Sequence, residues 1–122
     1  MEEKKQMKKN IKEENYLLRI PVHPEHLSFS HGDDGHVILT VENRGVMKRL
    51  TQILLRKPKQ SHIHLDELGS FIWERCDGQS SLLQIGESLD EHFGDKAKPT
   101  YERLSRFMAM LEQYKFIDWS NR

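Results

Sequence analysis

The chain is poor in cysteine, in net charge and in long apolar runs, and each shortage excludes a class of protein. One cysteine in 122 residues rules out an internal disulfide and so a disulfide-stapled secreted scaffold. Nineteen basic residues balance nineteen acidic ones, so no overall field favours nucleic acid or an anionic membrane. No apolar run approaches the roughly 20 residues of a membrane span, and no signal-peptide pattern is present. We therefore expect a cytoplasmic protein.

The sequence also lacks the short motifs of common enzyme chemistries. It has no glycine-rich phosphate loop, no G-x-S-x-G nucleophile elbow and no H-E-x-x-H zinc motif. Asp33 and Asp34 stand beside Gly35, which is typical of a turn rather than of paired catalytic carboxylates. We expect no catalytic residue and no cofactor.

Length and composition indicate one domain of modest size. The length suits a single domain, while a hydrophobic content of 36% is low for a fully folded chain. Residues 1–14, "MEEKKQMKKNIKEE", are charged and nearly free of apolar side chains, so we expect a disordered tail. The domain is expected to span residues 15–119.

The first third of this domain reads as β-structure. Residues 15–20, "NYLLRI", alternate in a way that predicts a strand, which Pro21 ends or places at an edge. "LSFS" and "HVILTVE" flank "HGDDG", whose Asp34-Gly35 pair predicts a hairpin turn. A third short strand is expected at residues 61–65, "SHIHL".

A basic segment separates the hairpin from the third strand. Residues 44 to 59 carry six bases and no acid, and apolar residues recur there at helical spacing. We expect a helix over residues 45–57 with Lys48, Arg49 and Arg56 on its polar face. That face is either solvated or a docking surface for an acidic partner, and both interpretations stay open.

Three further helices are expected after the third strand. Asp66 is a helix cap for a segment that Asp77-Gly78 ends. Ser81 with Gln84 forms a capping box for the next helix, and Gly94 is expected at the C-cap of that helix. Pro99 suits the first turn of the last helix. The predicted fold is α+β and winged-helix-like: a three-stranded antiparallel sheet, then a three-helix bundle, with the basic helix before the third strand.

The single cysteine and the seven histidines raise two chemical possibilities. Cys76 falls at a helix C-terminus on an apolar face, where the helix dipole disfavours a thiolate, so we interpret it as a core residue. One cysteine with scattered histidines does not supply the ligands of a structural zinc site. His62 and His64 share one strand face, and they are candidates for a pH-sensitive contact with a ligand.

The segment "HLDELGSFIWERCDG" and the helix after it resemble the PqqD-like family, named after pyrroloquinoline-quinone synthesis and also called the RiPP recognition element. The likeness covers about Leu27 to Ile117. Its matching positions are Leu65, Asp66, Glu67, Gly69, Ile72, Trp73, Cys76, Asp77, Gly78, Ser81 and Ile85.

The resemblance implies a non-catalytic protein that binds the leader segment of a precursor peptide and presents it to a modifying enzyme, often a radical-SAM protein. In the family the leader adds as a strand to the sheet edge and lies against the last helix. Carried over by position, the peptide-binding residues are Ser61, His62, Ile63, His64, Leu65, Tyr101, Leu104, Phe107 and Met108.

Two positions depart from the family pattern. The basic helix replaces a short connection, which bears on the partner surface. Lys115 stands where the last helix usually ends at Gly, so a different exit from that helix is expected. We expect a monomer.

Two other functions remain open. One is a winged-helix DNA binder, although the last helix carries few bases. The other is a scaffold that docks only to an enzyme.

Overall fold

The computed structural model describes residues 15–42 and 60–120, which fall into two compact units. The sheet unit is Glu25–Ser70, and the helical unit joins residues 15–24 to residues 71–120. The predicted tail at residues 1–14 and the predicted basic helix at residues 45–57, with Lys48, Arg49 and Arg56, lie outside the described residues.

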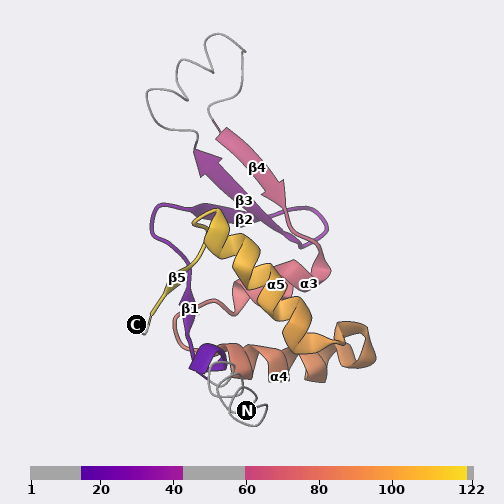
Figure 1. Ribbon diagram of the computed structural model, residues 1–122. Coiled ribbons are helices and arrows are strands. Elements are labelled where there is room, and N and C mark those ends of the chain that lie inside the picture. Colours follow the sequence, from indigo (N-terminus) through magenta and orange to yellow (C-terminus); the bar gives the residue numbers. More distant parts are fainter. Residues whose placement is uncertain (1–14, 43–59, 121–122) are drawn as a thin grey trace. The chain divides into compact units, whose positions relative to one another are not determined.

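The sheet unit contains three antiparallel strands in the order β2-β3-β4 (Figure 1). They are β2 (Ser28–His31), β3 (Val37–Glu42) and β4 (Gln60–His64). The predicted hairpin and third strand are therefore confirmed. In the turn, Gly35 has a φ of 83°, and the His36 N–H donates to the Asp34 carboxylate at 2.9 Å.

Side chains alternate between the two faces of this sheet. Val37 and Leu39 are fully buried and share their face with Ile63 of β4. The opposite face carries Thr40 beside His62 and Ile38 beside His64. One face is thus apolar and the other is polar and open to solvent.

A buried serine ties the start of β3 to the first turn of α3 (Glu67–Glu74). The Val37 N–H donates to Ser70 Oγ at 2.8 Å, and the Leu65 N–H donates to the Val37 carbonyl at 2.9 Å. The predicted cap is confirmed, because the Asp66 carboxylate accepts the Gly69 N–H at 2.7 Å.

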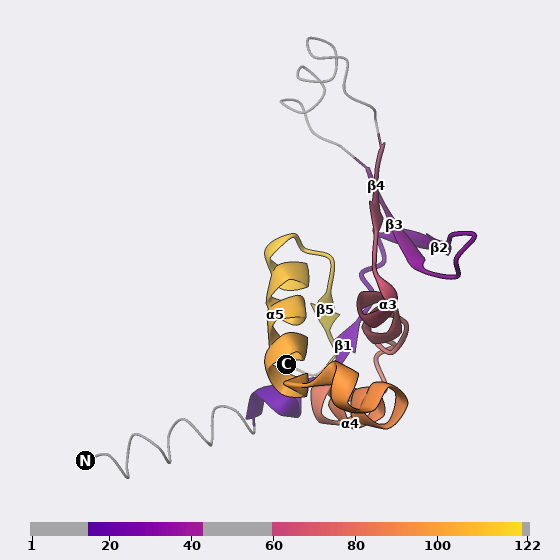
Figure 2. The ribbon, with the colours of Figure 1, turned by 90° about the vertical axis from the view of Figure 1, so that its right-hand side faces the viewer.

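The helical unit contains the remainder of α3, then α4 (Leu82–Phe93), the 3₁₀ turn η1 (Gly94–Ala97) and α5 (Thr100–Gln113). α4 and α5 run in clearly different directions (Figure 2). The Ser81–Gln84 capping box is confirmed, and Gly94 caps the C-terminus of α4 as expected. Pro99 takes the N-cap position of α5, one residue before its first turn.

The two longest helices touch through a glycine. A β-carbon on Gly86 would lie 2.3 Å from the ring of Tyr101, so only glycine fits there without a shift of the ring. The Tyr101 hydroxyl donates to the Leu83 carbonyl at 3.1 Å. This contact fixes Tyr101 against α4.

Lys115 takes the role that glycine usually has at a helix end. Its φ is +60°, the left-handed conformation, and the Phe116 N–H donates to the Leu111 carbonyl at 2.7 Å. Together with the bond from the Lys115 N–H to the Glu112 carbonyl at 3.1 Å, this is a Schellman motif. The expectation of a different exit from this helix is therefore wrong, because the lysine turns the chain as a glycine would, at the cost of the Cβ strain of that conformation.

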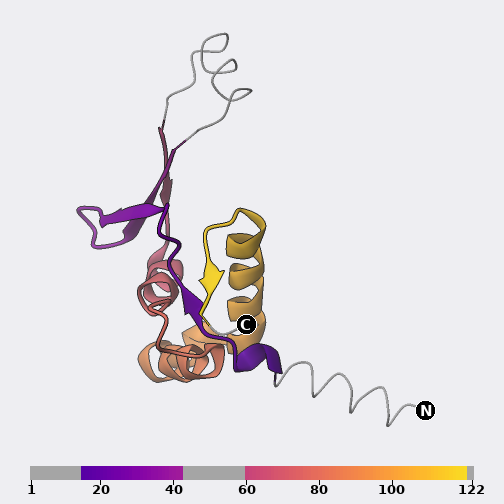
Figure 3. The ribbon, with the colours of Figure 1, turned by 90° about the vertical axis from the view of Figure 1, so that its left-hand side faces the viewer.

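The strand predicted over residues 15–20 is wrong. Residues 15–17 are helical, and the strand β1 is Pro21–Val22, which pairs with β5 (Asp118–Trp119) (Figure 3). The Tyr16 ring meets Trp119 edge-on at 6.2 Å, and the Arg19 guanidinium lies 3.9 Å from that indole's centre. These contacts with a residue a hundred positions away override a short alternating pattern.

The coarse fold class is confirmed: a mixed α+β chain with a three-stranded antiparallel sheet followed by helices. Among residues 15–42 and 60–120, no helix is both long and apolar enough to cross a membrane.

Candidate functional site

One edge of the sheet is formed by β4, which has β3 as its only strand neighbour among the described residues. Val37 and Leu65 stand opposite each other, and the Leu65 N–H bonds to the Val37 carbonyl. Along an antiparallel strand, the backbone N–H and C=O groups of successive residues point alternately to one neighbour and to the other. The N–H and C=O groups of residues 61, 63 and 65 therefore point to β3. His62 and His64 therefore turn their backbone N–H and C=O groups to the open edge.

The predicted residues of β4 divide between the two faces. His62 and His64 are exposed, Ser61 and Ile63 are partly buried, and Leu65 is buried just after the strand. His62 Nδ1 lies 3.3 Å from the Thr40 hydroxyl, which orients the imidazole on the polar face. His62 and His64 thus turn their backbone groups to the open edge of β4 and their imidazoles to the polar face of the sheet.

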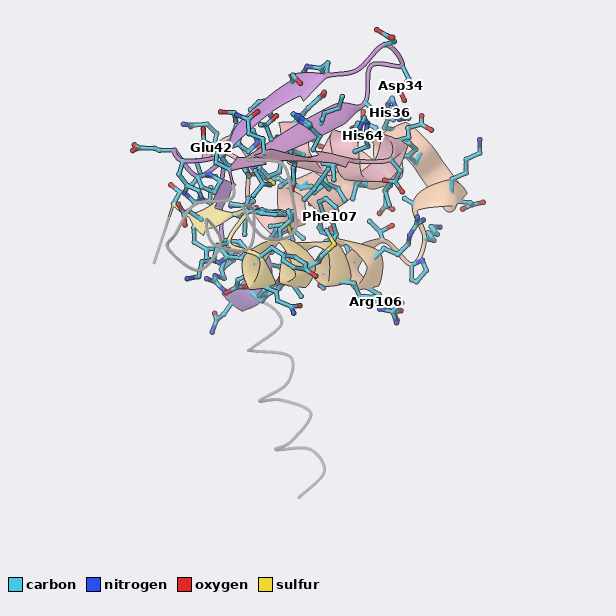
Figure 4. The ribbon with its side chains drawn as sticks, turned by 90° about the horizontal axis from the view of Figure 1, so that it is seen from above. Asp34, His36, Glu42, His64, Arg106 and Phe107 are labelled. Atoms are coloured by element: carbon cyan, nitrogen blue, oxygen red, sulfur yellow. The ribbon has the colours of Figure 1, made fainter. Side chains whose placement is uncertain are left out.

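A small charged group stands at one end of the polar face. Asp34, His36 and His64 gather there, whereas Glu42 lies at the other end (Figure 4). His36 Nδ1 lies 3.2 Å from the Asp34 carboxylate. The pKa of Asp34 is lowered, chiefly because the backbone N–H of His36 donates to it, with smaller contributions from the imidazoles of His36 and His64.

The sequence did not identify this neighbourhood. The sequence predicts Asp34 as a turn residue and His36 as the first residue of the following strand. The signal that finds them is the strand register, which pairs Ile38 with His64 and so brings the turn close to the end of β4.

The predicted residues of α5 differ in exposure. The side chains of Leu104 and Met108 are buried, with 1% and 0% of their surface exposed. Those of Tyr101 and Phe107 are partly exposed to solvent. Phe107 and its neighbour Arg106 lie on different faces of the helix (Figure 4). Burial raises the pKa of Tyr101, and the nearby Glu87 and Asp90 raise it further.

Both arginines of α5 are engaged within the helical unit. Arg106 pairs with Glu102 at 2.6 Å, and Arg103 donates to the Lys96 carbonyl at 2.6 Å. A DNA-recognition helix needs basic side chains that are free to reach phosphates and bases. These contacts therefore argue against a recognition helix.

Cys76 is unsuited to chemistry. Its side chain is fully buried, and its thiol donates to the Ile72 carbonyl at 3.3 Å. Burial, with the nearby Asp77 carboxylate, raises the pKa of Cys76 to about 12. A nucleophilic cysteine needs a lowered pKa, so the interpretation of Cys76 as a core residue is confirmed.

The turn after Cys76 holds β1 instead. The His23 N–H donates to the Cys76 carbonyl at 3.1 Å, and the Gly78 N–H donates to the Pro21 carbonyl at 3.0 Å. The His23 ring stacks on Trp73 at 4.2 Å. The segment thus serves as an anchor within the helical unit.

In the part of the chain that the structure describes, no group of three or more His, Cys, Asp or Glu side chains is arranged to hold a metal ion. The predicted partner-binding residues Lys48, Arg49 and Arg56 lie outside that part.

A family model described as "Coenzyme PQQ synthesis protein D (PqqD)" matches residues 35–117, more than half of the chain and parts of both units. No match was found among curated proteins or among solved structures.

Proposed function

Because the chain belongs to the PqqD family of non-catalytic, peptide-binding chaperones, and so is not an enzyme, we propose that it binds the leader segment of a ribosomally made precursor peptide. It then presents the bound precursor to a modifying enzyme, with a radical-SAM protein as the partner that the family implies.

The observation that supports this proposal is the open edge of β4. His62 and His64, two residues apart, turn their backbone to the open edge and offer the N–H and C=O groups that an added strand needs. Main-chain bonds of this kind supply affinity for any extended peptide. Selectivity then comes from the side chains on the two faces of the new strand.

The family also implies that the leader contacts α5. On that helix Tyr101 and Phe107 are the proposed contacts, because they keep exposed surface. Leu104 and Met108 are buried, so we propose that they support these two side chains from below.

The remaining features of the proposal rest on the family and on the sequence. They are a winged-helix-like arrangement, one domain over residues 15–119, a cytoplasmic location, a monomeric state and docking of the modifying enzyme through Lys48, Arg49 and Arg56.

The test is a titration of the isotope-labelled protein with the leader of a precursor peptide encoded beside its gene. Backbone amide signals of residues 60–65 and of α5 are expected to shift. Absence of any shift in those residues contradicts strand addition, and a partner enzyme that co-purifies without leader binding favours the scaffold function instead.

A matched pair of variants separates strand addition from side-chain contact. His62→Pro removes the N–H that points to the open edge and leaves the bonds to β3 in place, as edge strands tolerate. His62→Gln keeps that N–H. At about pH 8, where imidazole is ordinarily neutral, we expect the proline variant to bind about tenfold more weakly. The glutamine variant should bind as the wild type does.

A further inference from the structure

We propose that the peptide received by β4 carries acidic side chains two residues apart, which His62 and His64 bind on the polar face of the sheet, and that binding tightens as the pH falls. This inference rests on the proposed function and names the substrate class and the regulation of the same edge.

The first step is the direction of the backbone. His62 and His64 turn their N–H and C=O groups outward, so the residues of an added strand that stand opposite them form the hydrogen-bonded positions. Directly opposite residues in a sheet point to the same face, with Cβ atoms about 5 Å apart. Two peptide side chains are thereby brought beside the two imidazoles.

The second step is the spacing. Side chains in a strand return to the same face every second residue. His62 and His64 are two residues apart, and so are their two partners on the peptide. The intervening peptide residue points to the other face of the sheet, the one that carries Ile63 and Leu39, and an apolar side chain suits it there.

The third step is the charge around the imidazoles. On β3, His62 faces the Thr40 hydroxyl and has Glu42 one pair further along the same face, while His64 faces the apolar Ile38. At the turn, His36 and Asp34 form their own pair near His64. β2 contributes only Ser28 and Ser30 to this face.

Beyond His64, the Asp66 carboxylate is used to cap α3. No lysine or arginine of the described sheet unit is present, because residues 25–42 and 60–70 contain neither. The histidines are therefore the groups of this face that can gain positive charge, and Asp34 and Glu42 stand at its two ends.

The sign of the pH effect follows from these groups. A carboxylate beside an imidazole favours the protonated imidazole, so binding takes up protons. Affinity for an acidic peptide is then highest below the range in which imidazole ordinarily titrates, near pH 6.5. It is lost as the pH rises through that range, while the peptide carboxylates stay ionised throughout.

The experiment uses the full chain and three synthetic peptides that alternate Leu with Glu, with Gln or with Lys. Amide shifts in residues 60–65 report strand addition, and affinities are measured at about pH 5.5 and about pH 8. We expect the Glu peptide to bind about tenfold more tightly at the lower pH. The Gln peptide should show no such change, and the Lys peptide should bind most weakly.

Variants assign the effect to the two imidazoles. In His62→Gln/His64→Gln the pH dependence for the Glu peptide should vanish, while His26→Gln, an exposed histidine in the segment before β2, should keep it. By linkage, the Glu peptide should also raise the measured pKa of both imidazoles in the wild type.

The outcomes separate the two proposals. Equal binding of the Glu and Gln peptides at both pH values, with shifts in residues 60–65, overturns this inference and leaves strand addition intact. A pH dependence that survives the double variant also overturns it. No shift in residues 60–65 with any of the three peptides counts against strand addition itself.

Discussion

The sheet unit and the helical unit are built in opposite ways. The helical unit holds most of the fully buried side chains, among them Trp73, Leu104 and Met108. Both ends of α4 and the C-terminus of α5 are capped. The sheet unit is three short strands with one apolar face, an exposed β2 and an open β4 edge. Among the described residues, most of the fully buried side chains thus lie in the helical unit, whereas the edge strand β4 lies in the sheet unit.

This difference shows how a small protein can carry an open strand edge. An unpaired strand edge is a liability that invites association with other chains. Here the exposed His62 and His64 keep that edge polar, and Ser70 fixes the start of β3 from the next helix. In the described residues, the edge that we propose for strand addition is therefore lined by polar side chains.

The largest effect is expected from a truncated side chain on the buried face of α5. Met108→Ala should lower the free energy of unfolding by about 2–5 kcal/mol, since its side chain is fully buried. Phe107→Ala, at a partly exposed neighbour, should cost less stability and weaken leader binding more. Urea unfolding and leader titration of both variants measure this, and equal stability losses would show that Phe107 is a core residue.

A second prediction concerns the stability of the sheet unit. Ser70→Ala leaves the buried N–H of Val37 without its hydroxyl acceptor, and should cost about 1–3 kcal/mol of stability. Amide exchange should accelerate in β3 and β4 more than in α4. Ser70→Thr, which keeps the hydroxyl, serves as the control. If amide exchange accelerated equally in both units, the two units would unfold together and would not differ in stability.

The smallest expected effect concerns the end of α5. Lys115→Gly should raise the free energy of unfolding by about 1 kcal/mol, because glycine adopts a positive φ without Cβ strain. Lys115→Ala retains the β-carbon and should bring no such gain. Thermal unfolding of the two variants compares them directly, and equal effects would show that the conformation at this position is not strained.

The elements that were predicted correctly have local causes. Asp66, Ser81 and Gly94 act within one helical turn, and the Asp34-Gly35 turn sets the register of its own hairpin. The wrong strand at residues 15–20 has the opposite origin. Its alternation spans six residues, whereas its conformation is decided by Trp119 at the far end of the chain.

The candidate site divides in the same way. The family pattern predicts that residues 61–65 form an edge strand, while the register with β3 determines which way each residue of that strand faces. That register decides that His62 and His64 carry the outward backbone groups, and it brings Asp34 and His36 to one end of the polar face. Strand pairing joins residues far apart in sequence, so no local pattern encodes it.

By itself the sequence determined the class, the turns, the helix caps and the family, because these depend on neighbouring residues and on ordered motifs. Tertiary structure decided the rest. It placed β1 between β5 and the turn after Cys76, and it packed Tyr101 on Gly86. Each of these depends on contacts between distant segments, whose free energy outweighs the preference of the local chain.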